Sequence, residues 1–180
     1  AVAIVNTGPA DTAAYCSILF SSLVSNARSR LWITSPYFVP NNALVVALQA
    51  AALRGVDVRI ILPDKADQRI VELASFTYYD DMLNNGVRLY RYREHFMHQK
   101  VILVDDTVAG IGTVNLDNRS LYLNFEATAL VADHDFVKQV EAMLMDDFDN
   151  SMAVKSEHFD NKSLPFRVAS HLARLASPLL

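Results

Sequence analysis

The sequence predicts an α/β domain with a mixed β-sheet flanked by helices on both faces. Two observations support this. In the first half of the chain, strand-like and helix-like runs alternate, which is typical of parallel strands joined by crossover helices. In the second half, three strand-like runs follow one another closely, as antiparallel strands do. The 180 residues are 52% hydrophobic, which suffices for the core of one ordinary domain.

The first half contains four strand-like and three helix-like runs. Asp11 or Thr12 can cap the first helix, Asn41 or Asn42 the second, and Gly55 and Gly86 close the second and third. In chain order we expect a strand at 1–7, a helix at 12–26, a strand at 30–38, a helix at 43–54, a strand at 56–64, a helix at 66–86 and a strand at 87–93.

The second half begins with a β-hairpin. Residues 96–105 and 107–113 read as its strands, joined at Asp105-Asp106, and residues 124–133 read as the next strand. A helix follows over 134–152, and its acidic residues 146–149 should lie at a solvated end. We therefore expect one domain at 1–160 and a C-terminal helical tail at 161–180.

The start of the sequence favours a longer parent protein. Residue 1 is not methionine, and the opening run reads as a strand of folded structure rather than as a signal peptide. No apolar run is long enough to span a bilayer. We expect this chain to be a C-terminal portion of a larger protein.

The net charge and the single cysteine limit the classes of function that the sequence supports. The net charge of -4 and a pI near 5.7 provide no electrostatic footprint for nucleic acid, so we expect no nucleic-acid partner. Cys16 lies in an apolar helical pattern, which predicts a buried structural thiol rather than a nucleophile or a disulfide partner.

The stretch HQKVILVDD at 98–106 places two ionisable side chains at the head of an apolar run. If the strand extends through them, period-two alternation puts His98 and Lys100 on one face. Asp105 is at an odd offset from His98, so it should lie in the turn and order the backbone there rather than share the pocket.

Downstream residues can complete a phosphate-binding site. The run GIGTVN at 110–115 has small residues before Asn115, where the backbone must approach closely. Glu126 stands inside an apolar run, and a carboxylate there needs a partner. A neutral imidazole can attack phosphorus, while a lysine and an asparagine amide on the same face hold phosphate oxygens. This chemistry requires no metal or other cofactor, and we expect none.

Each of these features has a simpler structural explanation when it is taken alone. A lone His-x-Lys at a strand end is more often a solvated terminus, and single glutamates occur on edge strands. Their close spacing with the glycine run and Asn115 favours a catalytic site.

The same residues resemble a known family. HQKVILVD carries the His-x-Lys-x4-Asp signature of the phospholipase D superfamily, with Gly112 after six further residues. The superfamily usually has Gly-Ser or Gly-Gly at that place, whereas this chain has Gly112-Thr113 followed by Asn115. Gly-Thr-x-Asn is similar to the bacterial cardiolipin synthase branch of the superfamily. The segments SPYFVP (35–40), RGVDVRIILP (54–63), GTVNLDNRSLYLNFE (112–126) and SPLL (177–180) extend the likeness over essentially the whole chain.

The resemblance implies a phospholipase D-like fold and a mechanism. Members carry two signatures, one in each half, and form one active site between them, in which one histidine becomes phosphatidylated and the other acts as acid and then base. This chain holds the second signature only. The motif residues that carry over are His98, Lys100 and Asp105, with Asn115 as phosphate binder and Glu126 as partner of His98; Thr113 and Gly112 support the site.

The implied reaction is the condensation of two phosphatidylglycerols to cardiolipin and glycerol at the bacterial inner membrane, with this part as a soluble domain at the membrane surface. The N-terminal half, or a second copy of the chain, would be the protein partner. A homodimeric single-signature phosphodiesterase, nuclease or phospholipase D is an alternative, as is a half-domain that is inert without its partner.

Two other segments allow two interpretations each. Tyr37 and Phe38 in SPYFVP could line a substrate channel or pack a proline-bracketed turn on the core. In the tail, apolar residues recur at 164, 168, 172, 175 and 179, with Arg167, His171 and Arg174 on another face. This helix could lie on an anionic bilayer or dock on the domain.

Overall fold

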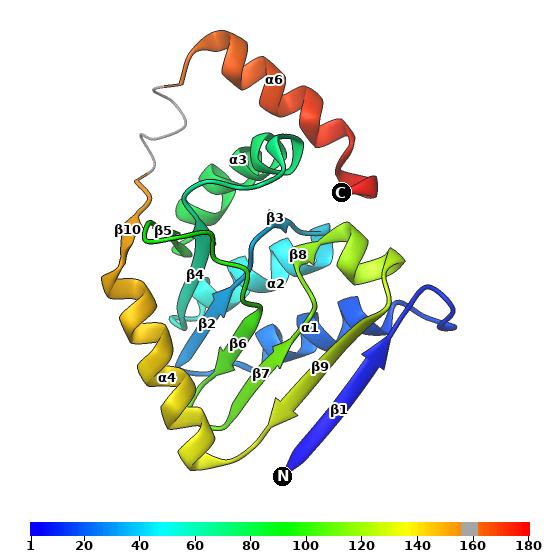
Figure 1. The fold of residues 1–180 in the computed structure, drawn as a ribbon, viewed down its shortest axis with the longest axis vertical. Coiled ribbons are helices and arrows are strands. Elements are labelled where there is room, and N and C mark those ends of the chain that lie inside the picture. Colours follow the sequence, from blue (N-terminus) through cyan, green and yellow to red (C-terminus); the bar gives the residue numbers. More distant parts are fainter. Residues whose placement is uncertain (156–161) are drawn as a thin grey trace.

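The computed structural model describes residues 1–155 and 162–180 (Figure 1). In this part of the chain, eight strands form one mixed sheet in the order β1-β9-β7-β6-β2-β4-β5-β10, and β3 pairs separately with β8. The strands are β1 (Val2–Thr7), β2 (Arg30–Thr34), β3 (Phe38–Val39), β4 (Asp57–Pro63), β5 (Arg88–Tyr92), β6 (Val101–Val104), β7 (Val108–Gly112), β8 (Leu116–Asp117), β9 (Glu126–Val131) and β10 (Ser151–Ala153).

Helices cover both faces of the sheet, as predicted (Figure 1). They are α1 (Tyr15–Asn26), α2 (Asn42–Leu53), α3 (Arg69–Leu83), α4 (His134–Asp149) and α6 (Leu164–Leu175), with a short π-helix η1 (Arg119–Leu123) and a 3-10 helix η2 (Ser177–Leu179). One buried cluster joins α1, α2 and α3 to one face, and a second joins α4 to the other.

The direction of the strands differs between the two halves of the chain. β2, β4 and β5 are parallel, which follows from the crossover helices between them. β6, β7 and β9 are antiparallel neighbours, and β6 joins this half to the parallel half by pairing with β2. The hairpin of β6 and β7 is therefore confirmed.

The helix ends agree with the sequence in part. Asn41 caps α2 by accepting a hydrogen bond from the Leu44 amide at 2.8 Å. Gly55 and Gly86 have positive φ angles of 89° and 87°, which explains why glycine ends these turns. The cap predicted for the first helix is wrong, because α1 starts at Tyr15 and Asp11 instead accepts from the Gly8 amide at 2.8 Å.

Three further expectations need correction. β6 begins only at Val101, so the residues before it are not in a strand. The short strand β10, which pairs with β5, was expected as the end of a helix. Asp147 in the acidic run at 146–149 is buried, although that run was expected to be solvated.

The remaining expectations concern Cys16, the domain boundary and membrane-spanning helices. Cys16 is buried, and burial raises the pKa of its thiol to about 11, as suits a structural cysteine. The expected boundary between 160 and 161 falls outside the described residues. Within the described residues, no helix combines the length and apolar character needed to cross a membrane.

Candidate active site

The candidate site lies at one end of the sheet, where three segments meet. The loop before β6, the loop after β7 and the start of β9 come together because β6, β7 and β9 are adjacent and antiparallel. This arrangement brings the loop that carries His98 and Lys100 next to the segments that carry Thr113, Asn115 and Glu126.

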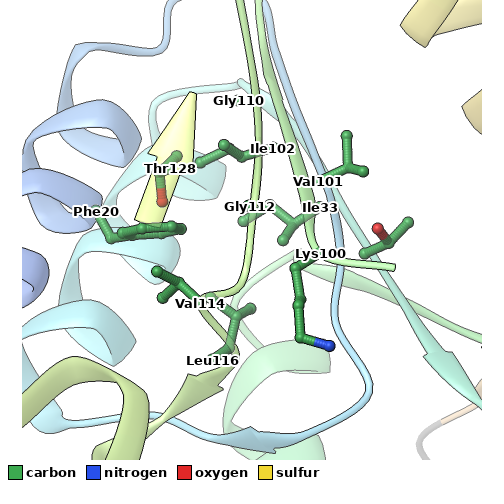
Figure 2. Close-up of a pocket in the computed structure, with 11 residues that line it drawn as sticks. Phe20, Ile33, Lys100, Val101, Ile102, Gly110, Gly112, Val114, Leu116 and Thr128 are labelled. Atoms are coloured by element: carbon green, nitrogen blue, oxygen red, sulfur yellow. The ribbon is translucent and has the colours of Figure 1, made fainter. Parts of the chain in front are cut away.

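Lys100 is half-buried at this junction. Its stem lies against a mostly apolar cavity of about 10 Å³, and its nitrogen points away from Phe20 on the opposite wall (Figure 2). Burial lowers the pKa of Lys100, while the carboxylates of Glu126, Asp117 and Asp67 favour its charged form. The ammonium therefore faces a polar neighbourhood in which it can bind an anion.

His98 is exposed and lies beside Lys100. The Lys100 ammonium donates a hydrogen bond to the His98 carbonyl oxygen at 2.8 Å, which ties the two residues together although neither is in a strand. The imidazole packs against the Phe96 ring with 5.6 Å between centroids. It makes no hydrogen bond to any residue that the structure describes, so neither ring nitrogen is occupied by a protein partner.

Glu126 is buried at the start of β9, where it meets Thr113. The Thr113 hydroxyl donates to the Glu126 carboxylate, and Asn124 Nδ2 donates to it at 3.2 Å. These contacts supply the partners that a buried carboxylate requires. Among the described residues, Glu126 has no hydrogen bond to His98, so the structure does not join this predicted pair directly.

Gly112 permits the close approach of β7 to β9. A Cβ on Gly112 would collide with the Ala127 carbonyl oxygen and lie 2.9 Å from the Thr128 Cα, too close for any side chain. This explains the glycine before Thr113, as the small-residue run predicted. The approach lets Thr113 reach across to Glu126.

Asn115 lines a hollow of about 230 Å³ with Asp117, Arg119 and Leu180. Its Oδ1 is buried and has no hydrogen-bond partner among the described residues, which leaves an unsatisfied polar atom at the hollow. Asp117 accepts from the Ser120 amide at 2.7 Å, and burial raises the pKa of its carboxyl. The segment around β8, from Asn115 to Arg119, therefore carries polar groups into the site.

The two aromatic residues of SPYFVP lie in different surroundings. Phe38 is 1% exposed and belongs to the core, whereas Tyr37 lines the same hollow as Asn115. The Tyr37 hydroxyl donates to Asp67 at 2.8 Å, and burial with this carboxylate raises the pKa of Tyr37 to about 12. Tyr37 thus remains a neutral hydrogen-bonding group at the site.

Asp105 lies at the opposite end of β6, away from His98. It has a positive φ of 52°, and its carboxylate accepts from Ser29 N and Oγ at 2.7 and 2.8 Å and from Arg30 N at 3.0 Å. Burial would raise the pKa of Asp105, but the hydrogen bonds from Arg30, Ser29 and Arg28 lower it. Asp105 therefore orders the turn and the start of β2.

Sequence reasoning missed the anchor of the His98 loop. Gln99 Nε2 donates a hydrogen bond to the buried Asp147 carboxylate of α4. Gln99 stands between the two signature residues, so its hydrogen bond to α4 holds the segment that carries them. Nothing in the local sequence pairs Gln99 with a residue 48 positions later.

Comparison with known proteins identifies similar sequences. Residues 20–148 match the family model described as "Cardiolipin synthase, PLD-like domain". The chain is 47% identical over 174 residues to cardiolipin synthase A of Pseudomonas putida (strain W619), covering 97% of this chain and 36% of that protein. It is 44% identical over 177 residues to cardiolipin synthase A of Pseudomonas syringae pv. syringae (strain B728a), covering 98% and 37%. The chain thus spans little more than a third of the length of these relatives.

Solved structures share the fold. Phosphatidylserine synthase of Haemophilus influenzae Rd KW20 superposes with a TM-score of 0.78 at 16% identity, covering 99% of this chain and 48% of that one. The phospholipase D family member Nuc from Salmonella typhimurium superposes with a TM-score of 0.72 at 19% identity, covering 86% and 98%. At these identities the likeness concerns the fold alone.

Proposed function

Since the chain belongs to the family of phospholipase D-like cardiolipin synthase domains, we propose that it supplies one half of a phosphatidyltransferase active site. The reaction is the condensation of two phosphatidylglycerols to cardiolipin and glycerol. Residues 1–160 form the catalytic domain in this proposal. The relatives named cardiolipin synthase A are far longer than this chain, so we assign the other half of the site to a second signature-bearing domain. We place the enzyme at the bacterial inner membrane, with this domain at its surface.

The proposed reaction has two steps through a phosphohistidine. One signature histidine attacks phosphorus of the first phosphatidylglycerol, the bond from phosphorus to the glycerol oxygen breaks, and the other histidine protonates the leaving oxygen. The second phosphatidylglycerol then loses its hydroxyl proton to that histidine. Its oxygen bonds to phosphorus as the phosphorus–nitrogen bond breaks, which restores the free enzyme.

The observation that carries this assignment is the accessible imidazole of His98 tied to Lys100. The Lys100 ammonium is charged beside several carboxylates and can hold non-bridging phosphate oxygens. Asn115, which lines the hollow, is the proposed phosphate binder through its amide N–H. Glu126 is the proposed partner of the His98 imidazolium, because catalytic hydrogen bonds often form only with substrate bound. Asp105 supports the site by fixing the far turn.

The test uses the full-length protein with phosphatidylglycerol in detergent micelles and mass spectrometry of the products. Wild type should form cardiolipin and glycerol, and His98→Ala should lose at least about a thousandfold in rate, since covalent and acid–base roles both fail. His134→Ala, which removes an exposed histidine on α4, is the control. Cardiolipin formation by His98→Ala at the normal rate would contradict the proposal. Acid quenching followed by peptide mapping identifies which histidine carries the phosphatidyl group.

A further inference from the structure

The C-terminal helix α6 docks on the domain through a face that is not its apolar one. It packs against α3, with Ser170 fully buried and Ala173 7% exposed at the contact. The Phe166 ring meets the Phe76 ring edge to face at 5.2 Å between centroids. Arg174 lies over the Tyr78 ring at 4.5 Å. Docking therefore uses small, aromatic and cationic side chains.

The aliphatic side chains of α6 point the other way. At about 100° per residue, Leu164, Val168 and Leu172 lie roughly opposite Ser170 on the helix. Leu175 continues this face, and Leu179 follows in η2. We call these five residues the outward row; they are exposed by 73%, 50%, 62%, 78% and 72% in chain order. An exposed aliphatic row at helical spacing, on a helix already packed by its other side, marks an interaction surface.

The charges of residues 162–180 indicate which kind of partner fits the outward row. Residues 162–180 contain Lys162, Arg167, Arg174 and His171 and no Asp or Glu, whereas the whole chain carries a net charge of -4. Arg167 and His171 lie on the flank between the docked face and the outward row, and both are exposed. An aliphatic face bordered by basic side chains complements a bilayer with anionic headgroups.

The outward row also adjoins the candidate site. Leu175 and Arg174 line a cleft of about 840 Å³ together with Asn118. Asn118 Nδ2 donates to the Ser177 carbonyl oxygen at 2.8 Å, and Arg119 N donates to the Leu180 carbonyl oxygen at 2.9 Å. The end of the tail is therefore fixed directly after β8, the short strand that Asn115 immediately precedes. A surface that contacts this row lies next to the hollow where phosphate is proposed to bind.

We propose that the outward row of α6 and η2 is the surface by which this domain rests on an anionic phospholipid bilayer. The choice of phosphatidylglycerol as the lipid rests on the proposed function; the contact itself does not require catalysis. The side chains enter the interface from one helix lying along the membrane plane. The contact resolves the two interpretations of the tail, because one face of α6 docks on α3 while the opposite face meets lipid.

A local fluorescent probe tests the contact in the full-length protein. The Leu172→Cys variant is labelled with a nitrobenzoxadiazole thiol reagent, which the buried Cys16 resists; other accessible cysteines are first replaced. Leu53→Cys is the matched control, because Leu53 is 72% exposed on α2, away from the row. Circular dichroism checks that both labelled proteins are folded.

Vesicles of phosphatidylglycerol should shift the emission at position 172 to shorter wavelength, and spin-labelled acyl chains should quench it. Position 53 should respond to neither. Vesicles of phosphatidylcholine should need at least about tenfold more lipid for the same response, because this bilayer carries no net negative charge. Dye at 172 that stays in water with phosphatidylglycerol would overturn the proposal. Dye at 172 that iodide cannot reach before lipid is added would also overturn it, since another protein surface would then cover the row.

A second variant separates this contact from the proposed reaction. For this test the probe is attached at another position of the row, through Leu164→Cys. Combining Leu172→Ser with Leu175→Ser should raise the lipid concentration needed for the response of this probe by at least about tenfold. The double serine variant should keep the wild-type rate on phosphatidylglycerol in detergent micelles. Loss of micellar activity in every protein, wild type included, would contradict the proposed function and leave the bilayer contact standing.

Discussion

The Thr113 side chain is hydrogen-bonded both to the Glu126 carboxylate and to the backbone of β9, the strand that carries Glu126. Its hydroxyl donates to the Glu126 carboxylate and accepts from the Ala127 amide at 3.0 Å, so one side chain satisfies two groups of β9. The superfamily resemblance leaves this position open to serine or glycine, and only a hydroxyl can make both hydrogen bonds. The orientation of Glu126 thus depends on the residue type at position 113.

We expect Thr113→Val to be more damaging than Thr113→Ser. Valine keeps the shape but removes both hydrogen bonds, and the free energy of unfolding should fall by about 1–3 kcal/mol because Glu126 loses a donor. Cardiolipin synthesis should fall about tenfold or more, since the carboxylate is no longer held. Serine should keep both properties near wild type. Denaturant titration and initial rates measure them, and equal effects of the two substitutions would argue against this hydrogen-bonding role.

Lys100 should set an alkaline limit on activity. Burial lowers the pKa of its ammonium, so the charge that holds phosphate is lost at a pH below the ordinary lysine value. The initial rate of the wild type should therefore decrease as the pH rises between about 7 and 10.5. Lys100→Arg, which stays charged, should have a lower rate and should not show this alkaline decrease. If the alkaline decrease is unchanged in Lys100→Arg, another group causes it.

Asp105 should stabilise the fold only while it is ionised. Burial alone would raise the folded-state pKa of Asp105, but the hydrogen bonds from Arg30, Ser29 and Arg28 outweigh it and lower this pKa. The contribution of Asp105 to stability is therefore present above the unfolded-state pKa and is lost as the pH falls through the folded-state pKa. We expect Asp105→Asn to lower the free energy of unfolding by about 1–3 kcal/mol near pH 7 and to have a smaller effect near pH 2.

Denaturant titration at several pH values checks this prediction. Asp135→Asn serves as the control, because the side chain of Asp135 is 93% exposed and should give a small difference at every pH. A pH-independent loss in Asp105→Asn would show that shape, and not charge, is what the turn requires.

Gly112→Ala should separate β7 from β9. The new Cβ would collide with the Ala127 carbonyl oxygen, and this atom belongs to the backbone and cannot turn aside. We expect the free energy of unfolding to fall by about 1–3 kcal/mol or more and activity to fall with it, because the Thr113 contact depends on the approach. Ile111→Ala, at a neighbouring exposed position, should cost much less; comparable losses would mean that crowding is not the cause.

The sequence predicted the fold class, both sheet halves and the hairpin, because these depend on local periodicity and short connections. It also predicted that Asp105 lies in the turn, although the offset argument assumed a strand through His98 and β6 begins only at Val101. It did not predict β10, whose three residues carry no pattern of their own and are held by pairing with β5. The Gln99–Asp147 hydrogen bond could not be predicted either, because only tertiary packing brings α4 to the loop before β6.

Gln99 and Asp147 should hold the His98 loop in place. We expect Asp147→Ala to lower the rate of cardiolipin synthesis several-fold with little change in KM, because the loop loses its anchor while the binding groups remain. Asp147→Asn keeps an oxygen that can accept from Gln99, so it should keep most of the activity. Similar rates for the two variants would contradict an anchoring role.

The pH dependence of stability provides an independent measure of the same contact. Burial raises the pKa of Asp147, more than the Gln99 hydrogen bond lowers it, so the folded state favours the protonated acid. The stabilisation due to that proton is complete below the unfolded-state pKa and disappears as pH rises through the folded-state value. Asp147→Asn cannot ionise, so the free energy of unfolding of wild type relative to this variant should decrease between about pH 4 and 7. A constant difference over that range would mean that Asp147 is not buried as an acid.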